Sequence, residues 1–441
     1  MSIRAVDLFA GIGGFHAVGE ALGLETIYAC DVDPQCRSVY QKNWSLDPAG
    51  DIQSEVNDNK IMVPRHDILF AGFPCQPFSK SGSQRGMEEA RGTLFFNIAK
   101  VLEARRPRLV VLENVRNLWS SRHQGDWETI IAILRSLNYR VADTPLVTSP
   151  HRIPPELGGT PQIRERVYIN ATYVPPSLQG QFGLVADSIT REEAGQTWNP
   201  QEWSLQRFLP SLQGSAANEL ELDQREIEWL DVWEDFLNLF TRRAKKLPGF
   251  PLWFDVWTGQ LEIESEMPEW KQRFIQQNIN FYNENKFEID SWKDAHRNLE
   301  NFPTSRRKFE WQAGDLDSIW MGLIQFRPSG IRVKPANYIP AAVAMNQTSI
   351  YGPKKRRISV GELARLQGFP DWFSFEDQKA SSSYKQLGNG IAIASAYHSV
   401  RAHIRRDEHL LSSQRRRDIV ELEIRAPDSP FTNLEKSPQD R

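Results

Sequence analysis

Reactive side chains stand at the ends of short apolar runs in this sequence. Cys75 follows the apolar residues 67–73 and precedes a Ser/Gly-rich stretch at residues 79–83. A thiolate is useful as a nucleophile where a strand opens into a loop. A free cysteine is more often a small buried side chain, so this interpretation depends on the groups that accompany Cys75.

A carboxyl group and two guanidinium groups are the best candidates to accompany it. Glu113 ends the apolar run 109–112, which predicts a strand buried on both faces and a raised pKa for this carboxyl group. Such a group can donate a proton to a base, although capping of the next helix is an alternative role. Arg164 and Arg166 alternate within residues 162–169, which predicts a strand with both side chains on one face. A fixed pair of this kind suits a pyrimidine carbonyl oxygen and its flanking phosphate.

The N-terminal residues predict a strand, a glycine turn and a helix. Asp31 ends a second short strand, twenty residues after Gly11. Glycines let a backbone approach a ligand, helix N-termini offer free N–H groups, and a carboxylate at this position suits ribose hydroxyls. A dinucleotide-binding turn would have a third glycine where this chain has His16, and Phe9 is available to stack on a purine. The pattern favours an adenosyl ligand without a pyrophosphate over NAD.

Together these segments resemble the DNA (cytosine-5)-methyltransferase family. The motifs that carry the resemblance occur in family order, at residues 7–14, 31–34, 72–79, 113–115, 162–166, 357–369 and 386–390. The resemblance covers residues 1–170 and 351–400 and leaves the middle of the chain unmatched.

The resemblance implies both the reaction and the residues that perform it. Cys75 would add to C6 of a flipped cytosine, and Glu113, Arg164 and Arg166 would act on the same base, without a metal. The methyl donor would be S-adenosyl-L-methionine. Its implied binding residues are Asp7, Phe9, Ala10, Gly11, Gly13, Gly14, Asp31, Val32, Asp51, Ile52, Pro74, Leu94, Asn389 and Ile391. DNA contacts are implied for Gln76, Ser79 and Ser81, and packing roles are expected for Cys30 and Cys36.

The expected fold class is α/β: a doubly wound, Rossmann-like methyltransferase domain with a large inserted target-recognition domain. The expected parts are a catalytic and donor-binding domain at 1–170, a target-recognition domain at 171–350, a return to the catalytic domain at 351–400, and a charged C-terminal helix with a frayed tail at 401–441. The loop 79–92 is expected to close over the flipped base.

The middle of the chain has the composition of a separate domain. It holds ten of the fourteen tryptophans, an amphipathic stretch at residues 223–246 and a second helical stretch at 268–293. Residues 325–334, with Arg327 and Arg332, are favoured for major-groove contact because arginine reads guanine well; an ordinary surface hairpin is an equally good interpretation. The basic clusters 306–308 and 354–357 are expected to contact phosphates, and 415–417 to be solvated.

Composition agrees with this scheme. The chain has 441 residues, 40% of them apolar, which suits two or three domains, and its net charge of −3 does not by itself indicate a nucleic-acid partner. The N-terminus lacks a signal segment, no stretch of 18 apolar residues occurs, and the three cysteines lack C-x-x-C spacing. We therefore expect a cytoplasmic monomer without disulfides, zinc or a membrane contact.

Two other functions share part of the pattern. An RNA (tRNA) cytosine-5 methyltransferase would have the same core, and a non-catalytic DNA-binding regulator would lack the need for Cys75, Glu113 and Arg166. The large insert favours double-stranded DNA as the partner. Many members of this family belong to restriction-modification systems. The resemblance therefore implies that the chain is the modification enzyme of such a system, with a cognate restriction endonuclease acting separately.

Overall fold

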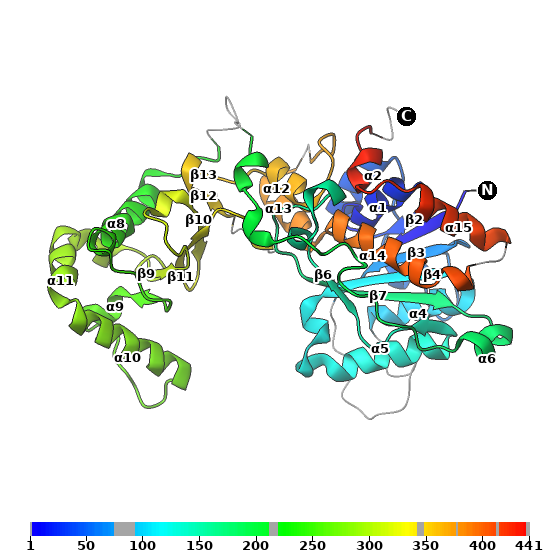
Figure 1. Cartoon of the computed structure of the whole chain (residues 1–441), viewed down its shortest axis with the longest axis horizontal. Helices are drawn as coiled ribbons and strands as arrows, with labels where there is room; N and C mark the ends of the chain where they lie inside the picture. Colours follow the sequence, from blue (N-terminus) through cyan, green and yellow to red (C-terminus); the bar gives the residue numbers. More distant parts are fainter. Residues whose placement is uncertain are drawn as a thin grey trace. The chain divides into compact units, whose positions relative to one another are not determined.

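The chain folds into two compact units. The computed structural model describes residues 2–74, 93–210, 219–341, 348–375, 378–411 and 414–437. The first unit comprises Met1–Trp203, Pro340–Met345 and Leu363–Arg441, and the second comprises Ser204–Ile339 and Asn346–Glu362 (Figure 1). Residues 171–203, which were expected to open the insert, belong to the first unit, where the Trp203 indole N–H donates to the His151 carbonyl at 2.7 Å.

A twisted sheet forms the centre of the first unit. Its described strands lie in the order β2-β1-β3-β4-β7-β5, with β6 also paired to β7. The bounds are Arg4–Leu8 for β1, Glu25–Cys30 for β2, Ile68–Gly72 for β3, Leu109–Val115 for β4, Tyr139–Val141 for β5, Leu146–Thr148 for β6 and Arg166–Tyr173 for β7. Strands β1 to β4 are parallel and β7 is antiparallel to β4. Since β2 and β3 flank β1, the strand order reverses at β1, which is where doubly wound sheets bind ligands.

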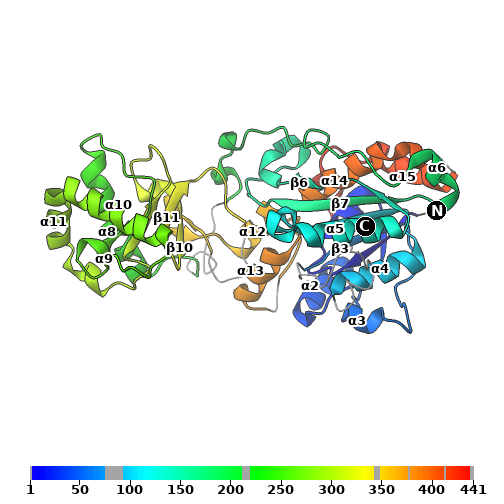
Figure 2. The same cartoon turned by 90° about the horizontal axis from the view of Figure 1, so that it is seen from below.

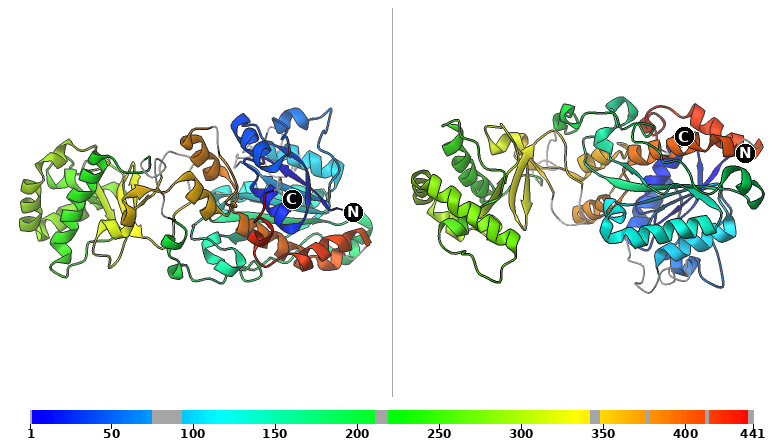
Figure 3. Two further views of the ribbon diagram at one scale, coloured as in Figure 1. Left: turned by 90° about the horizontal axis from the view of Figure 1, so that it is seen from above. Right: turned by 60° about the horizontal axis from the view of Figure 1, so that its bottom comes forward.

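Helices cover both faces of this sheet (Figure 3). The bounds are Gly14–Leu22 for α1, Pro34–Trp44 for α2, Ile52–Glu55 for α3, Leu94–Arg105 for α4, Gln124–Ser136 for α5, Gln179–Phe182 for α6, Val360–Gln367 for α12, Ala380–Asn389 for α13, Ile393–Arg406 for α14 and Gln414–Arg425 for α15. Leu69 and Ala71 of β3 point into a core with α4 and α5. Phe70 points to the other face and stacks on Phe15 of α1, with ring centroids 5.0 Å apart. This alternation explains why β3 is a continuous apolar run.

Residues 414–437 pack against other helices of the first unit, whereas the last residues of the expected tail, 438–441, lie outside the described residues. Glu423 of α15 forms ion pairs with Arg401 and Arg405 of α14 at 3.1 and 2.7 Å. The side-chain amide of Asn433 donates to the Ala21 carbonyl of α1 at 2.8 Å, and Leu434 is 1% exposed. The charges of this segment therefore pair between helices, although their density suggested a solvated tail.

The second unit has its own sheet (Figure 2) and its own hydrophobic core. Its described strands lie in the order β13-β12-β10-β11-β9-β8. The bounds are Leu252–Trp253 for β8, Lys308–Trp311 for β9, Gly322–Arg327 for β10, Gly330–Pro335 for β11, Ile350–Tyr351 for β12, Arg356–Arg357 for β13, Gln224–Thr241 for α8, Phe254–Trp257 for α9, Glu269–Glu284 for α10 and Lys286–Ala295 for α11. The predicted amphipathic helix is confirmed as α8, and its Trp233 stacks on Phe309 of β9 at 4.9 Å.

One helical prediction in this unit needs correction. The expected single stretch at 268–293 divides at Asn285 into α10 and α11. Trp270, which was placed near the apolar side, is 54% exposed. No helix among the residues that the structure describes has the length and apolar character needed to cross a lipid bilayer.

Candidate active site

A cavity of about 660 Å³ opens at the carboxyl ends of β1, β2, β3 and β4. Its volume lies in the range of small-molecule and cofactor sites. The predicted site residues that line it are Phe9, Gly11, Asp31, Val32, Asp51, Ile52, Pro74, Leu94, Glu113, Arg166 and Asn389. The sequence-based choice missed other lining residues, namely Cys30, Asp33, Cys36, Gln53, Gly72, Phe73, Asn114, Val115, Lys385, Gln386 and Gly388. Most of these residues lie inside the motifs already recognised, so their position in a motif could have identified them as lining residues.

The glycine turn after β1 owes its composition to close packing. A Cβ atom on Gly13 would lie 2.1 Å from the Trp44 indole nitrogen, and one on Gly14 would lie 2.6 Å from Cβ of Ile391. Ala10, Gly13, Gly14 and Ile391 were expected to bind the donor but are not among the residues that line the cavity. Phe9, which does line it, has a φ of 57°, a left-handed conformation that is uncommon for a bulky residue and concentrates at functional sites.

Asp31 joins the first turn to the end of β2. Its Oδ2 accepts the Gly11 N–H at 2.8 Å and its Oδ1 accepts the Asp33 N–H at 2.8 Å. Burial raises the pKa of Asp31, and the two backbone N–H groups oppose the rise. Each carboxylate oxygen has more than one acceptor site, so Asp31 can also accept from hydroxyl groups in the cavity.

Asp7 has a different position from the one expected for a ligand-binding residue. Its side chain is fully buried in β1 and does not line the cavity. Burial raises the pKa of Asp7 well above its ordinary value, and the nearby Asp31 raises it further. Asp7 can therefore affect the site only through the residues that line the cavity.

Glu113 and Arg166 form an ion pair at the cavity wall. Arg166 Nε lies 3.0 Å from Glu113 Oε1, and the two side chains are 14% and 9% exposed. Burial raises the pKa of Glu113 while the Arg166 and Arg164 charges oppose the rise, so the predicted direction is confirmed. Glu113 is paired in register with Gly72 of β3. The arrangement offers a carboxyl group that can hold a proton and a guanidinium that fixes its orientation.

Arg164 does not line the cavity but donates hydrogen bonds to the backbone on both sides of a residue that does. Strand β7 begins at Arg166, so the expected strand from Gln162 is wrong at its start. Arg164 is fully buried and donates to the carbonyls of Gly388, at 2.9 Å, and Gly390. These carbonyls flank Asn389, which lines the cavity. Desolvation lowers the pKa of Arg164 to about 9.

The chain leading to Cys75 is anchored at the cavity. Pro74, which is bonded to Cys75, lines the cavity, and the Asn114 side-chain amide donates to the Phe73 carbonyl at 2.9 Å. Cys75, Gln76, Ser79 and Ser81, and the expected loop over the base, lie outside the described residues.

Cys30 and Cys36 are buried, as expected for packing residues, and both border the cavity. Burial raises the pKa of Cys30 to about 12. A thiol with such a pKa is a poor nucleophile at neutral pH, so Cys30 is a poor candidate for the nucleophile although it borders the cavity.

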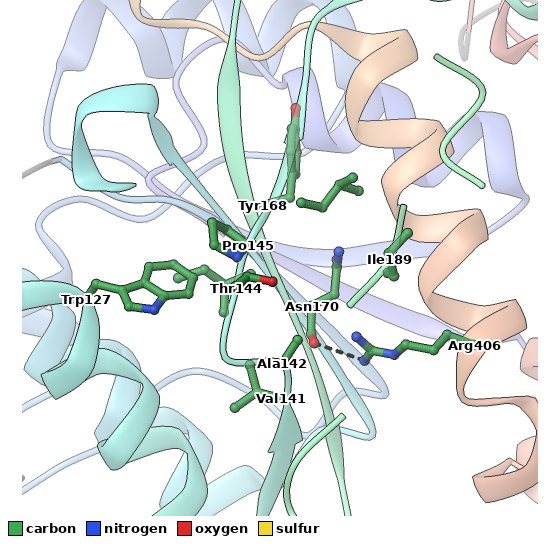
Figure 4. Close-up of a pocket in the computed structure, with 11 residues that line it drawn as sticks. Trp127, Val141, Ala142, Thr144, Pro145, Tyr168, Asn170, Ile189 and Arg406 are labelled. Atoms are coloured by element: carbon green, nitrogen blue, oxygen red, sulfur yellow. Dashed lines mark hydrogen bonds between the residues drawn. The ribbon is translucent and has the colours of Figure 1, made fainter. Parts of the chain in front are cut away.

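A second cavity lies beside β7 and is too small for a substrate. Arg406 donates to the Asn170 carbonyl at 3.1 Å at its edge (Figure 4). Its volume of about 10 Å³ is that of a single water site.

Within the basic clusters 306–308 and 354–357, Arg307, Arg356 and Arg357 pair with carboxylates. Arg356, expected to contact phosphate, is 5% exposed, and its two terminal nitrogens donate to Glu362 at 2.8 and 2.6 Å. Arg307 pairs with Asp255 at 3.1 Å. Arg327 and Arg332 lie on the hairpin of β10 and β11. The carboxylate partners of these arginines lie outside the basic runs, so the runs alone did not reveal the ion pairs.

The doubly wound sheet, the cavity at its switch point and the carboxyl–guanidinium pair define a Rossmann-like methyltransferase. The family model of C-5 cytosine-specific DNA methylases matches residues 3–405, and the chain belongs to this family. It is a DNA (cytosine-5)-methyltransferase.

Similar proteins agree with this assignment. The type II methyltransferase M.AluI of Cellulosimicrobium cellulans is 38% identical over 92% of each chain. The type II methyltransferase M.HhaI of Haemophilus parahaemolyticus is 41% identical over 38% of this chain and 48% of its own. A crystal structure of a candidate DNA modification methyltransferase encoded within an Escherichia coli prophage shares the fold, with a TM-score of 0.50, 18% identity and coverage of 93% of this chain and all of the other.

Proposed function

We propose that the chain transfers a methyl group from S-adenosyl-L-methionine to C5 of a cytosine flipped out of a specific duplex DNA sequence, through a covalent bond between Cys75 and C6. The observation that carries the proposal is the ion pair of Glu113 and Arg166 at a cavity whose wall includes Pro74, the neighbour of Cys75.

The cavity fits the proposed donor. Asp31 offers carboxylate oxygens for ribose hydroxyls, and Phe9 and Ile52 offer apolar surface for a purine. Asp51 and Asp33 begin helices α3 and α2 with their side chains accepting backbone N–H groups, at 3.0 and 2.9 Å, which fixes this wall. When bound, S-adenosyl-L-methionine supplies the methyl group as an electrophile.

The protein side chains would prepare cytosine for that electrophile. Addition of the Cys75 thiolate to C6 makes C5 an enamine carbon, and the developing charge on N3 takes the proton of Glu113. Arg166 holds Glu113 in position and offers its remaining N–H groups to the base carbonyl oxygen. After C5 has taken the methyl group, loss of its proton, return of the N3 proton to Glu113 and loss of the thiolate restore the aromatic ring.

The second unit is proposed to recognise the DNA sequence. It has its own hydrophobic core, separate from the sheet that carries the cavity. Its hairpin presents Arg327 and Arg332, and base-edge contacts of this kind specify a site while the chemistry acts on any flipped cytosine. Since the relatives are type II methyltransferases, we assign the chain as the modification enzyme of a restriction-modification system. A cognate endonuclease would act separately on the same DNA, and the enzyme would work as a monomer.

A duplex with 5-fluorocytosine at the target position tests the covalent step. Fluorine cannot leave as a cation, so the enzyme should remain attached to DNA after methyl transfer, and only when the donor is present. Cys75→Ser should abolish the adduct, because its hydroxyl is far less ionised at neutral pH. Cys30→Ser is the matched control and should still be trapped. An adduct in Cys75→Ser, or one mapped by peptide sequencing to Cys30 or Cys36, would refute the assignment of the nucleophile.

A further inference from the structure

Three neighbouring strands of the second unit carry polar side chains in one row. Gln325 of β10 is paired in register with Arg332 of β11, and Arg332 is paired with Glu310 of β9. The residues on either side of this row in the strands, Phe309, Ile324, Ile331 and Val333, are fully buried in the core. Since side chains alternate along a strand, the row faces away from that core.

Glu310 holds the guanidinium groups of this row. Its Oε2 accepts from Arg332 Nε at 2.8 Å and from Arg327 Nη1 at 3.3 Å. Its Oε1 accepts from the side-chain amide of Gln312. Both oxygens are therefore engaged, which fixes the carboxylate while the Arg332 and Arg327 side chains remain 22% and 32% exposed.

The contact with Glu310 leaves the far end of Arg332 available. Within the described residues, Glu310 alone accepts a hydrogen bond from Arg332, and it does so from Nε. The two terminal nitrogens present a planar fork, the geometry that matches O6 and N7 of guanine in the major groove.

The surroundings of the row carry excess positive charge. Arg327, Arg332 and Lys334 lie near one another with Glu310 as the nearby carboxylate; desolvation, and after it the repulsion among these cations, lowers the pKa of Arg327 and Lys334. Glu310 also borders a groove of about 550 Å³ whose wall includes the exposed Arg273 of α10. An excess of cations beside an open groove is complementary to DNA.

We infer that Arg332 reads a guanine of the recognition sequence and that Glu310 is the positioning residue that orients its guanidinium. This inference rests on the proposed function, in which the second unit selects the DNA site. Arg327 shares Glu310 and is placed to contact the neighbouring base pair or its phosphate. A guanidinium fixed before binding loses less side-chain entropy on contact with the base.

Selection from a random-sequence duplex library tests the inference without requiring methyl transfer. Duplexes bound by the full chain, by Arg332→Ala and by Arg332→Lys are sequenced. Both variants should lose a guanine preference at one position of the site, by about 5- to 150-fold, the value of one bidentate contact. Arg332→Lys should keep the salt dependence of binding because it keeps the charge.

Glu310 variants separate positioning from structure. Glu310→Ala should weaken the same guanine preference while tightening non-specific binding, because a carboxylate is removed from a basic surface. Glu310→Gln, whose amide oxygen can still accept from Nε, should be closer to the wild type. Arg243→Lys, in another ion pair of the second unit, with Glu288, is the control and should change no preference. Equal thermal unfolding temperatures exclude misfolding as the cause.

The outcomes are decisive for both assignments. Unchanged preference in Arg332→Ala would overturn the inference. So would uniform weakening at all sequences with a salt slope smaller by about one, the signature of a phosphate contact. A wild type that selects a guanine through Arg332 but fails to methylate the selected duplex would refute the proposed reaction and leave the inference standing.

Discussion

Replacing Glu113 with glutamine tests the role of the carboxyl group most directly. The amide oxygen can accept from Arg166 Nε, as Glu113 Oε1 does at 3.0 Å, and the amide N–H can face cytosine N3. Glu113→Gln therefore preserves shape and hydrogen bonding but has no proton to transfer. The change should lower the rate of methyl transfer and leave the affinity for DNA close to that of the wild type.

The size of the effect follows from the step that is lost. General acid–base catalysis contributes about 10²- to 10⁴-fold, or about 2.7 to 5.4 kcal/mol of activation free energy. The Glu113 and Arg166 side chains are only 9% and 14% exposed, so removal of the negative charge also affects folding. Because the amide keeps one hydrogen bond, we expect a loss of about 1 to 3 kcal/mol in the free energy of unfolding.

Single-turnover transfer of a labelled methyl group, measured across pH, is the assay. Burial raises the pKa of Glu113, so its protonated form persists to higher pH than that of an exposed carboxyl group. The wild-type rate should fall as pH rises through this pKa, and Glu113→Gln should lack that limb. Glu165→Gln is the control, because Glu165 precedes Arg166 in the sequence but does not line the cavity. A wild-type rate in Glu113→Gln, or an equal loss in Glu165→Gln, would refute the role of Glu113 as the acid.

Two further predictions concern aspartates of the first unit. Asp31→Ala should weaken donor binding by about 10- to 150-fold in a calorimetric titration, the value of a hydrogen bond to a charged group, without changing the DNA affinity; equal donor affinity would exclude Asp31 from the donor site. Asp7→Asn should stabilise the fold increasingly in urea unfolding as pH rises above the ordinary pKa of an aspartate, because the raised pKa of Asp7 means that the unfolded state releases its proton first and wild-type stability declines as pH rises. A difference between variant and wild type that does not change with pH would contradict the second prediction.

Local patterns predicted the parts of the fold whose partners are close in sequence. The strand, turn and helix at β1 and α1 follow from an apolar run that breaks at glycines, and Asp31 falls at the end of β2 as expected. The buried strand before Glu113 also followed from four consecutive apolar residues. These features depend on neighbours within a few residues, so periodicity and turn residues reveal them.

The features that were missed depend on distant partners. Arg164 donates to carbonyls of Gly388 and Gly390, more than 200 residues along the chain, and nothing around Arg164 indicates these acceptors. Arg356 is an exception, because its buried partner Glu362 lies only six residues further along, in the first turn of α12, and the pair was missed because the residues next to Arg356 are basic. The packing of residues 414–437 was missed because Glu423 has its partners on α14. Composition shows that such residues are present but does not indicate which residues they contact.

The wall of the cavity proposed to hold the donor has a consequence for biosynthesis. It combines residues near the start of the chain, such as Gly11 and Asp31, with Asn389 from near its end, which Arg164 holds in place. A ribosome adds about 5 to 20 residues per second, so Asn389 emerges roughly 14 to 55 s after Asn114. A growing chain therefore has the early sheet strands well before the cavity wall is complete. The time needed to translate the residues between Asn114 and Asn389 sets the earliest moment at which a newly made molecule can bind the proposed donor.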